Sequence, residues 1–395
     1  MRLVIFSHFF GPGAGGAEMQ VLSLASGLCE QNRRAGAPQF QVTVVSGVPD
    51  KNVKESYYPF AVIRRPSVFQ VWRLIGQADV VHLAGPVLTP LLIATLRRKP
   101  TVIEHHGYQS ICPNGILVHQ PERSVCPGYF QAKRYVECVK CQAHEMPLAQ
   151  STLNVLLTGA RCVLSKTVAA NVAITDHVLQ RHALPFSERI YYGTADQFSG
   201  TYPASSSGLN PNKSCVAFVG RFVPEKGIPV LLDAVAILKS EGLDFTVRLI
   251  GDGPQRAELD DIIAKNALND CVSITGYVSG AAMREALRDV SIVVVPSVWE
   301  EAAGLVALEQ MMDGRLVIAS AIGGLKEVVG AGGLLFPPGD AVALASLIKE
   351  ALQNCDLLRS VSKRARARAL QLFEIDRMVN DHVRLYLRLA QTRRD

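Results

Sequence analysis

The sequence predicts an α/β protein with two domains, each a parallel sheet covered by helices. Short β-branched runs alternate with helical stretches along the 395 residues, which is typical of parallel sheets. One hydrophobic core rarely organises more than roughly 250–300 residues, so two domains are expected. A stretch rich in Ser, Gly, Pro and Asn at 200–213 separates two such series and is typical of a linker.

The composition restricts the class of protein. Hydrophobic residues make up 48% and charged residues 19%, so there is enough apolar surface to fold and global disorder is excluded. The net charge of +6 allows anionic ligands or lipid headgroups, but it does not indicate nucleic acid, and we expect no nucleic-acid partner. No run reaches the roughly 18 apolar residues of a membrane span.

The run Leu3 to Phe10 favours a buried strand over a signal peptide, because it leads into a glycine loop and not into a small-residue cleavage site. We therefore expect a cytoplasmic protein. Its nine cysteines, an odd number, are then expected to stay reduced and not to form a disulfide framework.

In the first half, β-branched runs predict the strands and helical spacing of apolar residues predicts the helices. Strands are expected at Leu3–Ser7, Gln41–Ser46, Val80–Leu83, Thr101–Glu104, Val168–Ile174 and Arg189–Tyr192. Helices are expected at Ala17–Gln31 and Pro90–Arg97.

The second half repeats the pattern. Strands are expected at Val216–Gly220, Val247–Gly251, Val272–Gly276, Ser291–Pro296 and Leu316–Ser320. Helices are expected at Ile228–Ser240, Gln255–Asn266, Ala281–Asp289, Leu305–Met312 and Ala341–Gln353. The predicted domains are 1–199 and 214–372, and 373–395 forms a last helix. Because ligands of open α/β sheets bind beyond the carboxyl ends of the strands, we expect a substrate between the two domains.

Two cations follow the first strand of the second domain. Arg221 and Lys226 lie five residues apart across the turn from Gly220 to Gly227, so both can close on one anion. The alternative is two solvated loop charges. A second turn, Gly251 to Pro254, follows the next strand and is a weak signal alone.

A helix is expected to begin near Gly304, after the loop that follows Pro296. Its first amides have no partner within the helix and can receive a phosphate, and glycine lets a ligand approach closely. Glu301 in this loop and Glu309 in the helix can each reach a hydroxyl of one ligand. The alternative for either glutamate is a solvated helix charge.

Together these motifs resemble the retaining family 4 glycosyltransferases, which have the GT-B fold of two Rossmann-like domains facing each other across a cleft. Their signature, Glu-x7-Glu following Pro-Ser, is matched by Glu301 and Glu309. Further matching segments are 219–227, 250–254, 323–329 and 336–340. The resemblance covers essentially the whole chain and is strongest over 216–345.

The resemblance implies a nucleotide-diphospho-sugar donor, UDP- or GDP-linked, in the second domain. Arg221 and Lys226 would then hold the diphosphate with the amides of Gly304 and Leu305. Glu309 would bind the ribose and Glu301 a hydroxyl of the donor sugar. The family usually has Pro-Phe after the first glutamate, where this chain has Ala302-Ala303. That departure leaves the identity of the donor sugar open.

The first domain offers a glycine loop and a histidine. Gly15 and Gly16 precede a predicted helix, without the spacing of a dinucleotide-binding fingerprint, and the family has a similar loop at its cleft. His106 follows the predicted strand at 101–104 and aligns with a family histidine near the reacting centre. The alternative for His106 is a structural histidine.

Four cysteines cluster in the segment 106–145. Cys138 and Cys141 have a Cys-x2-Cys spacing, and Cys112 and Cys126 precede prolines. A structural zinc would fix a long loop that otherwise lacks a core; unligated thiols and redox pairing are the alternatives. Some family members have a similar Cys-rich insertion.

The resulting prediction is a retaining hexosyltransferase that acts on a glycan, lipid-linked or small-molecule acceptor. No cofactor is expected for catalysis, since the family uses no bound divalent metal and no Asp-x-Asp motif is evident. A GT-B sugar-nucleotide epimerase and a non-catalytic nucleotide-sugar-binding protein remain alternatives. The tail resembles the helix of GT-B enzymes that crosses back to the first domain. Its basic residues permit peripheral contact with the inner face of a membrane, or a solvated helix face.

Overall fold

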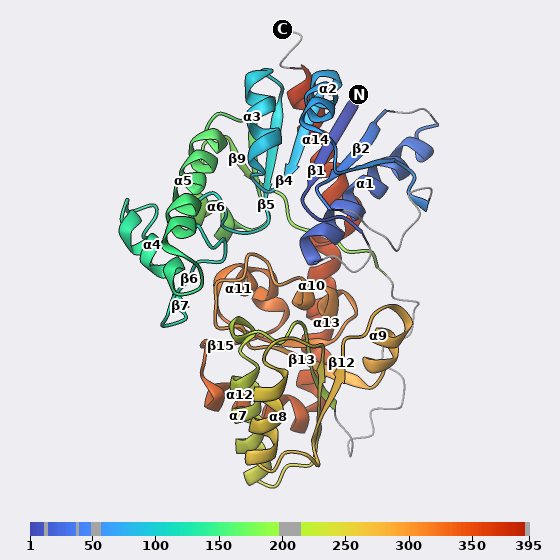
Figure 1. The fold of residues 1–395 in the computed structure, drawn as a ribbon. Coiled ribbons are helices and arrows are strands. Elements are labelled where there is room, and N and C mark those ends of the chain that lie inside the picture. Colours follow the sequence, from blue (N-terminus) through green and yellow to red (C-terminus); the bar gives the residue numbers. More distant parts are fainter. Residues whose placement is uncertain (12–14, 37–38, 49–56, 197–214, 392–395) are drawn as a thin grey trace. The chain divides into compact units, whose positions relative to one another are not determined.

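The computed structural model describes residues 1–11, 15–36, 39–48, 57–196 and 215–391. The expected linker at 200–213 lies outside these described residues. The chain divides into two compact units (Figure 1), which are treated separately below. The N-unit comprises Met1–Gly193 and Glu374–Asp395, and the C-unit comprises Thr194–Phe373.

The N-unit is built on a seven-stranded parallel sheet with the strand order β3-β2-β1-β4-β5-β8-β9. Its central strands are almost entirely buried, and β1 is a nearly continuous apolar run, as expected for a sheet covered on both faces. The strands are β1 (Arg2–Ser7), β2 (Gln41–Ser46), β3 (Ala61–Arg64), β4 (Val80–Ala84), β5 (Thr101–His105), β8 (Ala170–Ala173) and β9 (Ser187–Arg189).

Helices connect these strands, and a short antiparallel pair, β6 (Val118–His119) and β7 (Ser124–Val125), lies in the segment after β5. The helices are α1 (Gly16–Arg34), α2 (Val68–Gln77), α3 (Leu88–Leu96), α4 (Tyr135–Ala143), α5 (Leu148–Ser165), α6 (Asp176–His182) and α14 (Ile375–Gln391). Local sequence explains several helix starts. Ser67 and Gln70 form a capping box on α2, and the Thr175 hydroxyl accepts a hydrogen bond from the amide of Val178 in α6.

The C-terminal helix α14 belongs to the core of the N-unit, although it follows the C-unit in sequence. Met378, Val379, Leu385 and Tyr386 are buried in the same cluster as Leu3 and other residues of β1 and α1. The hydrophobic core of the N-unit is therefore complete only when the last segment of the chain packs against it.

The C-unit contains a six-stranded parallel sheet with the order β12-β11-β10-β13-β14-β15. In chain order this is 3-2-1-4-5-6, the doubly wound arrangement whose ligand site lies where the order reverses, between the first and fourth strands. The strands are β10 (Cys215–Val219), β11 (Thr246–Ile250), β12 (Val272–Gly276), β13 (Val290–Val295), β14 (Leu316–Ser320) and β15 (Leu334–Phe336).

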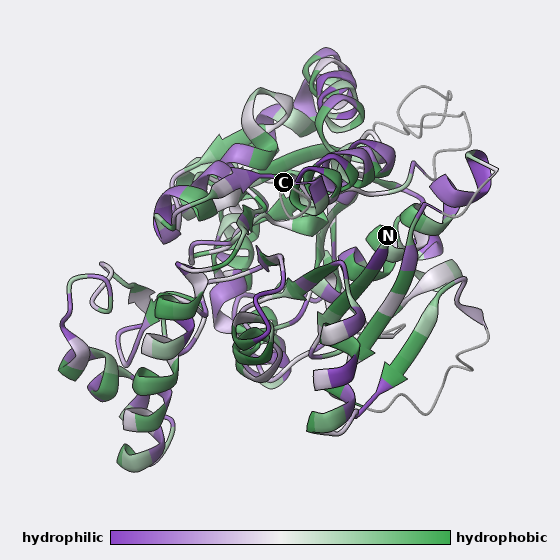
Figure 2. Cartoon of the chain, turned by 90° about the horizontal axis from the view of Figure 1, so that it is seen from above, coloured by the Kyte–Doolittle hydropathy of each residue, from purple (hydrophilic) through white to green (hydrophobic). Residues whose placement is uncertain are grey.

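Helices connect these strands as well, and most of their inward residues belong to one apolar cluster. The helices are α7 (Ile228–Ser240), α8 (Arg256–Lys265), α9 (Gly280–Ala286), α10 (Leu305–Met312), α11 (Gly323–Val329), α12 (Ala341–Gln353) and α13 (Cys355–Leu372). Short 3₁₀ turns are η2 (Pro224–Lys226) and η3 (Gly330–Gly332). In Figure 2 the strands of each unit are predominantly hydrophobic, whereas hydrophilic positions gather on the helices and loops.

The strand expected at Arg189–Tyr192 is misplaced, because the structure has β9 at Ser187–Arg189. The amide of Ile190 still donates to the carbonyl of Ala173, but the chain then leaves the edge of the sheet. The strand expected at Val168–Ile174 is shorter, at Ala170–Ala173. Among the described helices, none combines the length and apolar character needed to cross a bilayer.

Candidate functional site

In the C-unit, the predicted site residues lie in loops at the carboxyl ends of β10 and β13 and in α10, the helix that follows β13. These two strands are adjacent in the sheet and lie at the point where the strand order reverses. The loop after β10 contains Arg221 and Lys226, and the loop after β13 contains Glu301. The topology therefore brings together segments about 75 residues apart in sequence, at the usual ligand-binding position of this arrangement.

Lys226 and Glu301 form a largely buried ion pair. The Lys226 Nζ lies 2.9 Å from Oε1 of Glu301, and the Ser297 hydroxyl donates to the same oxygen. The Glu301 side chain is 7% exposed and that of Lys226 is 25% exposed. Lys226 also lies 5.9 Å from the centroid of the Trp299 ring. An ammonium group has three donors, so this pair fixes Lys226 while leaving donors for an anionic ligand.

A glycine allows these two loops to pack closely. Gly227 has φ +66°, and a Cβ at this position would lie 2.0 Å from the carbonyl oxygen of Pro296. The amide of Val298 donates to the carbonyl of Glu225 over 3.0 Å. The turn that carries Lys226 is therefore attached directly to the loop that carries Glu301, which explains their contact.

The turn after β11 supports the first part of the β10 loop. The amide of Phe222 donates to the carbonyl of Asp252 over 2.9 Å, and a Cβ at Gly253 would meet the Phe222 backbone. The side chain of Arg221, next to this anchor, is exposed and makes no hydrogen bond or ion pair with any residue in the described ranges. The structure thus holds the backbone at Arg221 in place and leaves its guanidinium group available.

Helix α10 begins close to the ion pair. Gly304 is its N-cap in a left-handed conformation, φ +79°, and Leu305 is its first residue, with no side chain capping the exposed amides. The carbonyl of Glu301 accepts a hydrogen bond from the amide of Gly324 over 2.7 Å, which ties the same loop to α11. Glu309 lies about one turn further along α10 with an exposed side chain. The start of α10 therefore presents partial positive charge beside Lys226.

In the N-unit, His106 follows β5 directly. Its Nδ1 lies 2.5 Å from the Tyr192 hydroxyl, and its Nε2 lies 3.8 Å from Oε2 of Glu104. Burial lowers the pKa of His106, while the nearby Glu104 and Glu18 carboxylates oppose that shift. The contact between Nδ1 and the Tyr192 hydroxyl holds the imidazole in one orientation.

The predicted glycine loop lies at the start of α1. Gly15 is the N-cap in an extended conformation and Gly16 is the first helical residue; both are exposed. A Cβ at Gly15 would lie 2.8 Å from Oε2 of Glu18, so glycine leaves room for this carboxylate above the helix start. The Gly15–Gly16 loop follows β1 and His106 follows β5, so both predicted features lie at the carboxyl edge of the same parallel sheet.

The four clustered cysteines are all buried and form no disulfide. Burial and neighbouring thiols raise the pKa of Cys112 to about 11 and that of Cys138 to about 12. Within the described residues, no three of these sulfur atoms lie within 4.8 Å of one another. The thiols are therefore neighbours but are not arranged as a closed tetrahedral set, and the structural zinc at Cys112, Cys126, Cys138 and Cys141 stays a prediction.

Several residues that the site uses were not predicted from the sequence. Ser297 is part of the Pro-Ser pair that precedes the first glutamate, so that motif was a usable signal. Glu18, Glu104 and Tyr192 lie in short segments that match or border family motifs, but no role was predicted for these three side chains. Only the fold brings them to His106.

Comparison with known proteins finds a family match over most of the C-unit. Residues 204–368 match the family described as Glycosyl transferases group 1. The 2-deoxystreptamine glucosyltransferase of Streptomyces kanamyceticus is 37% identical over 141 residues, 35% of this chain and 36% of that protein. The putative colanic acid biosynthesis glycosyltransferase WcaL of Salmonella typhimurium is 31% identical over 163 residues, 39% of this chain and 40% of that protein. These matches thus span well under half of each relative.

Solved structures match nearly the whole chain. HepE of Anabaena, in complex with UDP and glucose, has a TM-score of 0.71 at 18% identity and covers 97% of this chain and 98% of that chain. Sucrose-phosphate synthase from Thermosynechococcus elongatus has a TM-score of 0.72 at 21% identity and covers 99% of both chains. The fold is therefore that of the GT-B glycosyltransferases, with parallel sheets in two Rossmann-like halves. This confirms the predicted fold class.

Proposed function

We propose that the chain is a glycosyltransferase of family 4 that transfers a hexose from a nucleotide-diphospho-sugar to an acceptor hydroxyl with retention of anomeric configuration. The observation that carries this proposal is the Lys226–Glu301 ion pair beside the uncapped start of α10. It lies where a doubly wound sheet binds its ligand, within a Glycosyl transferases group 1 domain.

The donor diphosphate would lie against the start of α10. Lys226 and the amides of Gly304 and Leu305 supply positive charge there, and Arg221 offers an unengaged planar fork for the other phosphate oxygens. Glu309, one turn along the helix, would accept hydrogen bonds from the ribose hydroxyls. Glu301 holds Lys226 and offers its remaining oxygen to a hydroxyl of the donor sugar.

The reaction breaks the bond between the anomeric carbon and the diphosphate oxygen, and the electron pair leaves with the nucleoside diphosphate. Lys226, Arg221 and the helix amides stabilise the charge that develops there, an electrostatic contribution that is commonly the largest in catalysis. The acceptor hydroxyl attacks the same face of the sugar and its proton passes to the departing phosphate. This chemistry needs no bound metal.

The N-unit would contribute the acceptor side. His106, oriented by Tyr192, would meet the donor sugar near the reacting carbon, and the Gly15–Gly16 loop would contact donor phosphate or acceptor. Anabaena HepE has been solved with UDP, which favours a UDP-linked donor here. One relative is named for a small molecule, 2-deoxystreptamine, and another for the biosynthesis of colanic acid. We therefore propose a glycan, lipid-linked or small-molecule acceptor, and each of these classes belongs in the transfer assay. We further propose a cytoplasmic location at the inner face of a membrane, and one structural zinc on the clustered cysteines.

Ligand-induced stabilisation tests the donor site. A panel of UDP- and GDP-sugars is added to the full chain, and the melting temperature is measured. A ligand at 100 times its Kd stabilises a protein by about 2.7 kcal/mol, so the true donor should give a clear upward shift. No shift with any nucleotide sugar, UDP or GDP would contradict the proposal.

Transfer is then measured with the stabilising donor and a set of acceptors, and the anomeric configuration of the product is read by NMR. A retained configuration supports the proposal and an inverted one contradicts it. Conversion of the donor to an isomer without acceptor would instead identify an epimerase. Binding without transfer to any acceptor would identify a non-catalytic protein.

A further inference from the structure

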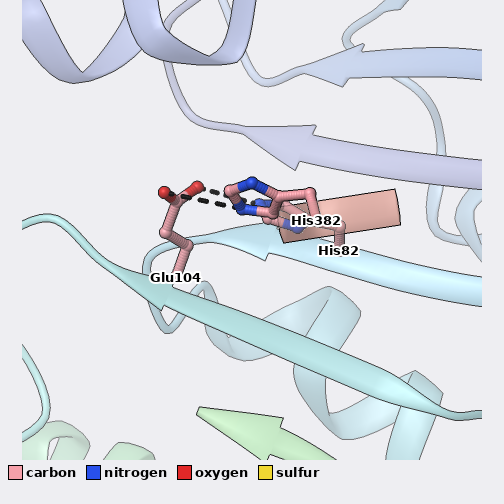
Figure 3. A group of neighbouring side chains, drawn as sticks. All are labelled: His82, Glu104 and His382. Carbon is pink, nitrogen blue, oxygen red and sulfur yellow. Dashed lines mark ion pairs between the residues drawn. The ribbon is translucent and has the colours of Figure 1, made fainter. Parts of the chain in front are cut away.

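A second group of polar side chains is buried in the N-unit, on three separate elements. His82 comes from β4, Glu104 from β5 and His382 from α14, and Figure 3 shows all three side chains converging. His82 and His382 are 0% exposed and Glu104 is 3% exposed. One ligand atom from each lies within 4.8 Å of the others, the only such group of three metal-ligating side chains in the described ranges.

The separations between these ligand atoms suit one small cation. The Nε2 of His82 lies 3.2 Å from Oε2 of Glu104, and the Nε2 of His382 lies 3.8 Å from Oε1 of Glu104. Two ligands of a tetrahedral zinc, each bonded at about 2.0–2.1 Å, are about 3.3 Å apart. Small side-chain adjustments would therefore place all three atoms around one metal ion.

The outer hydrogen bonds determine which ring nitrogen faces the centre. The Nδ1 of His382 lies 2.9 Å from the carbonyl oxygen of Met378, which can only accept, so Nδ1 carries the proton. In the neutral ring, Nε2 then presents a lone pair toward Glu104. The Nδ1 of His82 lies 2.8 Å from the Tyr386 hydroxyl, which can donate or accept, so this contact allows either tautomer of His82. Metal-bound histidines usually have such a partner on the other nitrogen.

The inner nitrogens lack hydrogen-bond partners. The Nε2 atoms of His82 and His382 are buried and make no hydrogen bond in the described structure. The Nε2 lone pair of His382 faces the Glu104 carboxylate and repels it, and a buried carboxylate is costly unless it is compensated. Either a proton on one imidazole or a metal ion between all three groups would remove this conflict, and the convergence of three ligand atoms favours the metal.

We propose that His82, Glu104 and His382 bind one divalent transition-metal ion, with zinc the best match to two imidazoles and a carboxylate. His106 lies next to the site, its Nε2 3.8 Å from Oε2 of Glu104, and is available as a fourth ligand. Because His382 belongs to α14, the metal fastens the last helix of the chain to β4 and β5. The proposal concerns stability; Glu104 and His106 also belong to the candidate site of the N-unit, so the tests below read zinc content and not sugar transfer.

Zinc content tests the site in a variant whose clustered cysteines can no longer bind zinc. The double variant Cys138→Ser/Cys141→Ser is purified, loaded with zinc, desalted and analysed by mass spectrometry. We expect about one zinc per chain to remain, because this ion does not depend on thiols. A folded double variant without zinc would overturn the proposal and would favour a shared proton.

Two further substitutions in this background locate the ion. His382→Gln should lower zinc content at least about tenfold. The matched control is His182→Gln, a buried helical histidine whose Nδ1 also contacts the carbonyl four residues earlier, at Val178, and which should keep its zinc. Zinc retained in His382→Gln, or lost equally in both variants, would contradict the assignment.

Cobalt provides a readout that does not require a stable His382 variant. Co²⁺ added to the metal-free double variant should give the visible absorption of a tetrahedral nitrogen and oxygen site without thiolate charge-transfer bands, and Zn²⁺ should displace it. EDTA should also lower the melting temperature of the zinc-loaded protein. No cobalt spectrum together with no effect of EDTA would overturn the site.

Discussion

At the scale of single residues, the candidate donor site depends on the buried carboxylate of Glu301, which has one cationic partner, Lys226. Glu301 is almost inaccessible to solvent and is paired with Lys226 and Ser297. Buried charges require such partners, so Lys226 positions Glu301 as much as Glu301 positions Lys226. This reciprocity was not visible in the sequence, where the two residues were assigned to different parts of the donor.

Lys226→Ala removes the ammonium group that would face the departing phosphate. We expect turnover to fall by at least about 100-fold, comparable to the loss of one preorganised donor. Steady-state kinetics at saturating donor measures this, and circular dichroism checks the fold because Glu301 loses its partner. Lys239→Ala is the control, since Lys239 pairs with the exposed Asp270. Near wild-type turnover in Lys226→Ala would refute the assigned role.

A second residue-scale prediction concerns pH. His182 is buried, and desolvation holds its pKa well below the usual range, with His105 and His177 adding to the shift and the hydrogen bond to Val178 opposing it. Tyr108 stacks on the same ring. The unfolded chain binds a proton on this imidazole below pH about 6.5, whereas the native state does not. The neutral His182 therefore contributes to the free energy of unfolding above pH about 6.5, and this contribution is lost progressively as the pH falls below that value.

Denaturant unfolding of wild type and His182→Gln at pH 7.5 and 5.5 measures this contribution. One proton taken up only by the unfolded state costs at most about 1.4 kcal/mol per pH unit. The wild type should therefore lose more stability than the variant on acidification. Equal losses would show that His182 is protonated in the native state.

At the scale of elements, glycines determine how closely helices pack. A Cβ at Gly27 in α1 would lie 2.4 Å from Cγ2 of Val379 in α14, so Gly27→Ala forces these helices apart and should destabilise the protein by about 1–3 kcal/mol. Gly159 in α5 has nothing within 4 Å of the same position, so Gly159→Ala should stabilise it by about 0.5–1 kcal/mol. Thermal unfolding of both variants checks the opposite signs; destabilisation of equal size in both would contradict the packing argument.

The elements found from sequence are those with strong periodicity. The predicted ranges for β2, β12, β14, α7, α10 and α12 coincide with the structure, because each contains a clear apolar run or stripe. The edge strands β3 and β15 have only four and three residues, too few for a pattern. Helix α13 was not predicted as a helix; six of its 18 residues are charged, and it is stabilised through contacts with α10 and β14.

At the scale of the whole molecule, the N-unit depends on both ends of the chain. Its core includes Met378, Val379, Leu385 and Tyr386 of α14, whereas the core of the C-unit contains no residue of that helix. Truncation after Phe373 should therefore open the N-unit and leave the C-unit folded. Hydrogen exchange read by mass spectrometry should show lost protection in β1 and β4 but not in β10 and β13. Retained protection in both units would refute this dependence.

The sequence by itself determined the alternation of strands and helices, the GT-B expectation and the loops that hold Lys226, Glu301 and Gly304, because these features are local periodicities and motifs. Only the tertiary structure decided that Glu301 pairs with Lys226, that Tyr192 orients His106, and that His382 meets His82 and Glu104. The physical reason is that each of these contacts joins residues between about 75 and 300 positions apart. Strand order and the return of α14 bring them together, and no local pattern records either.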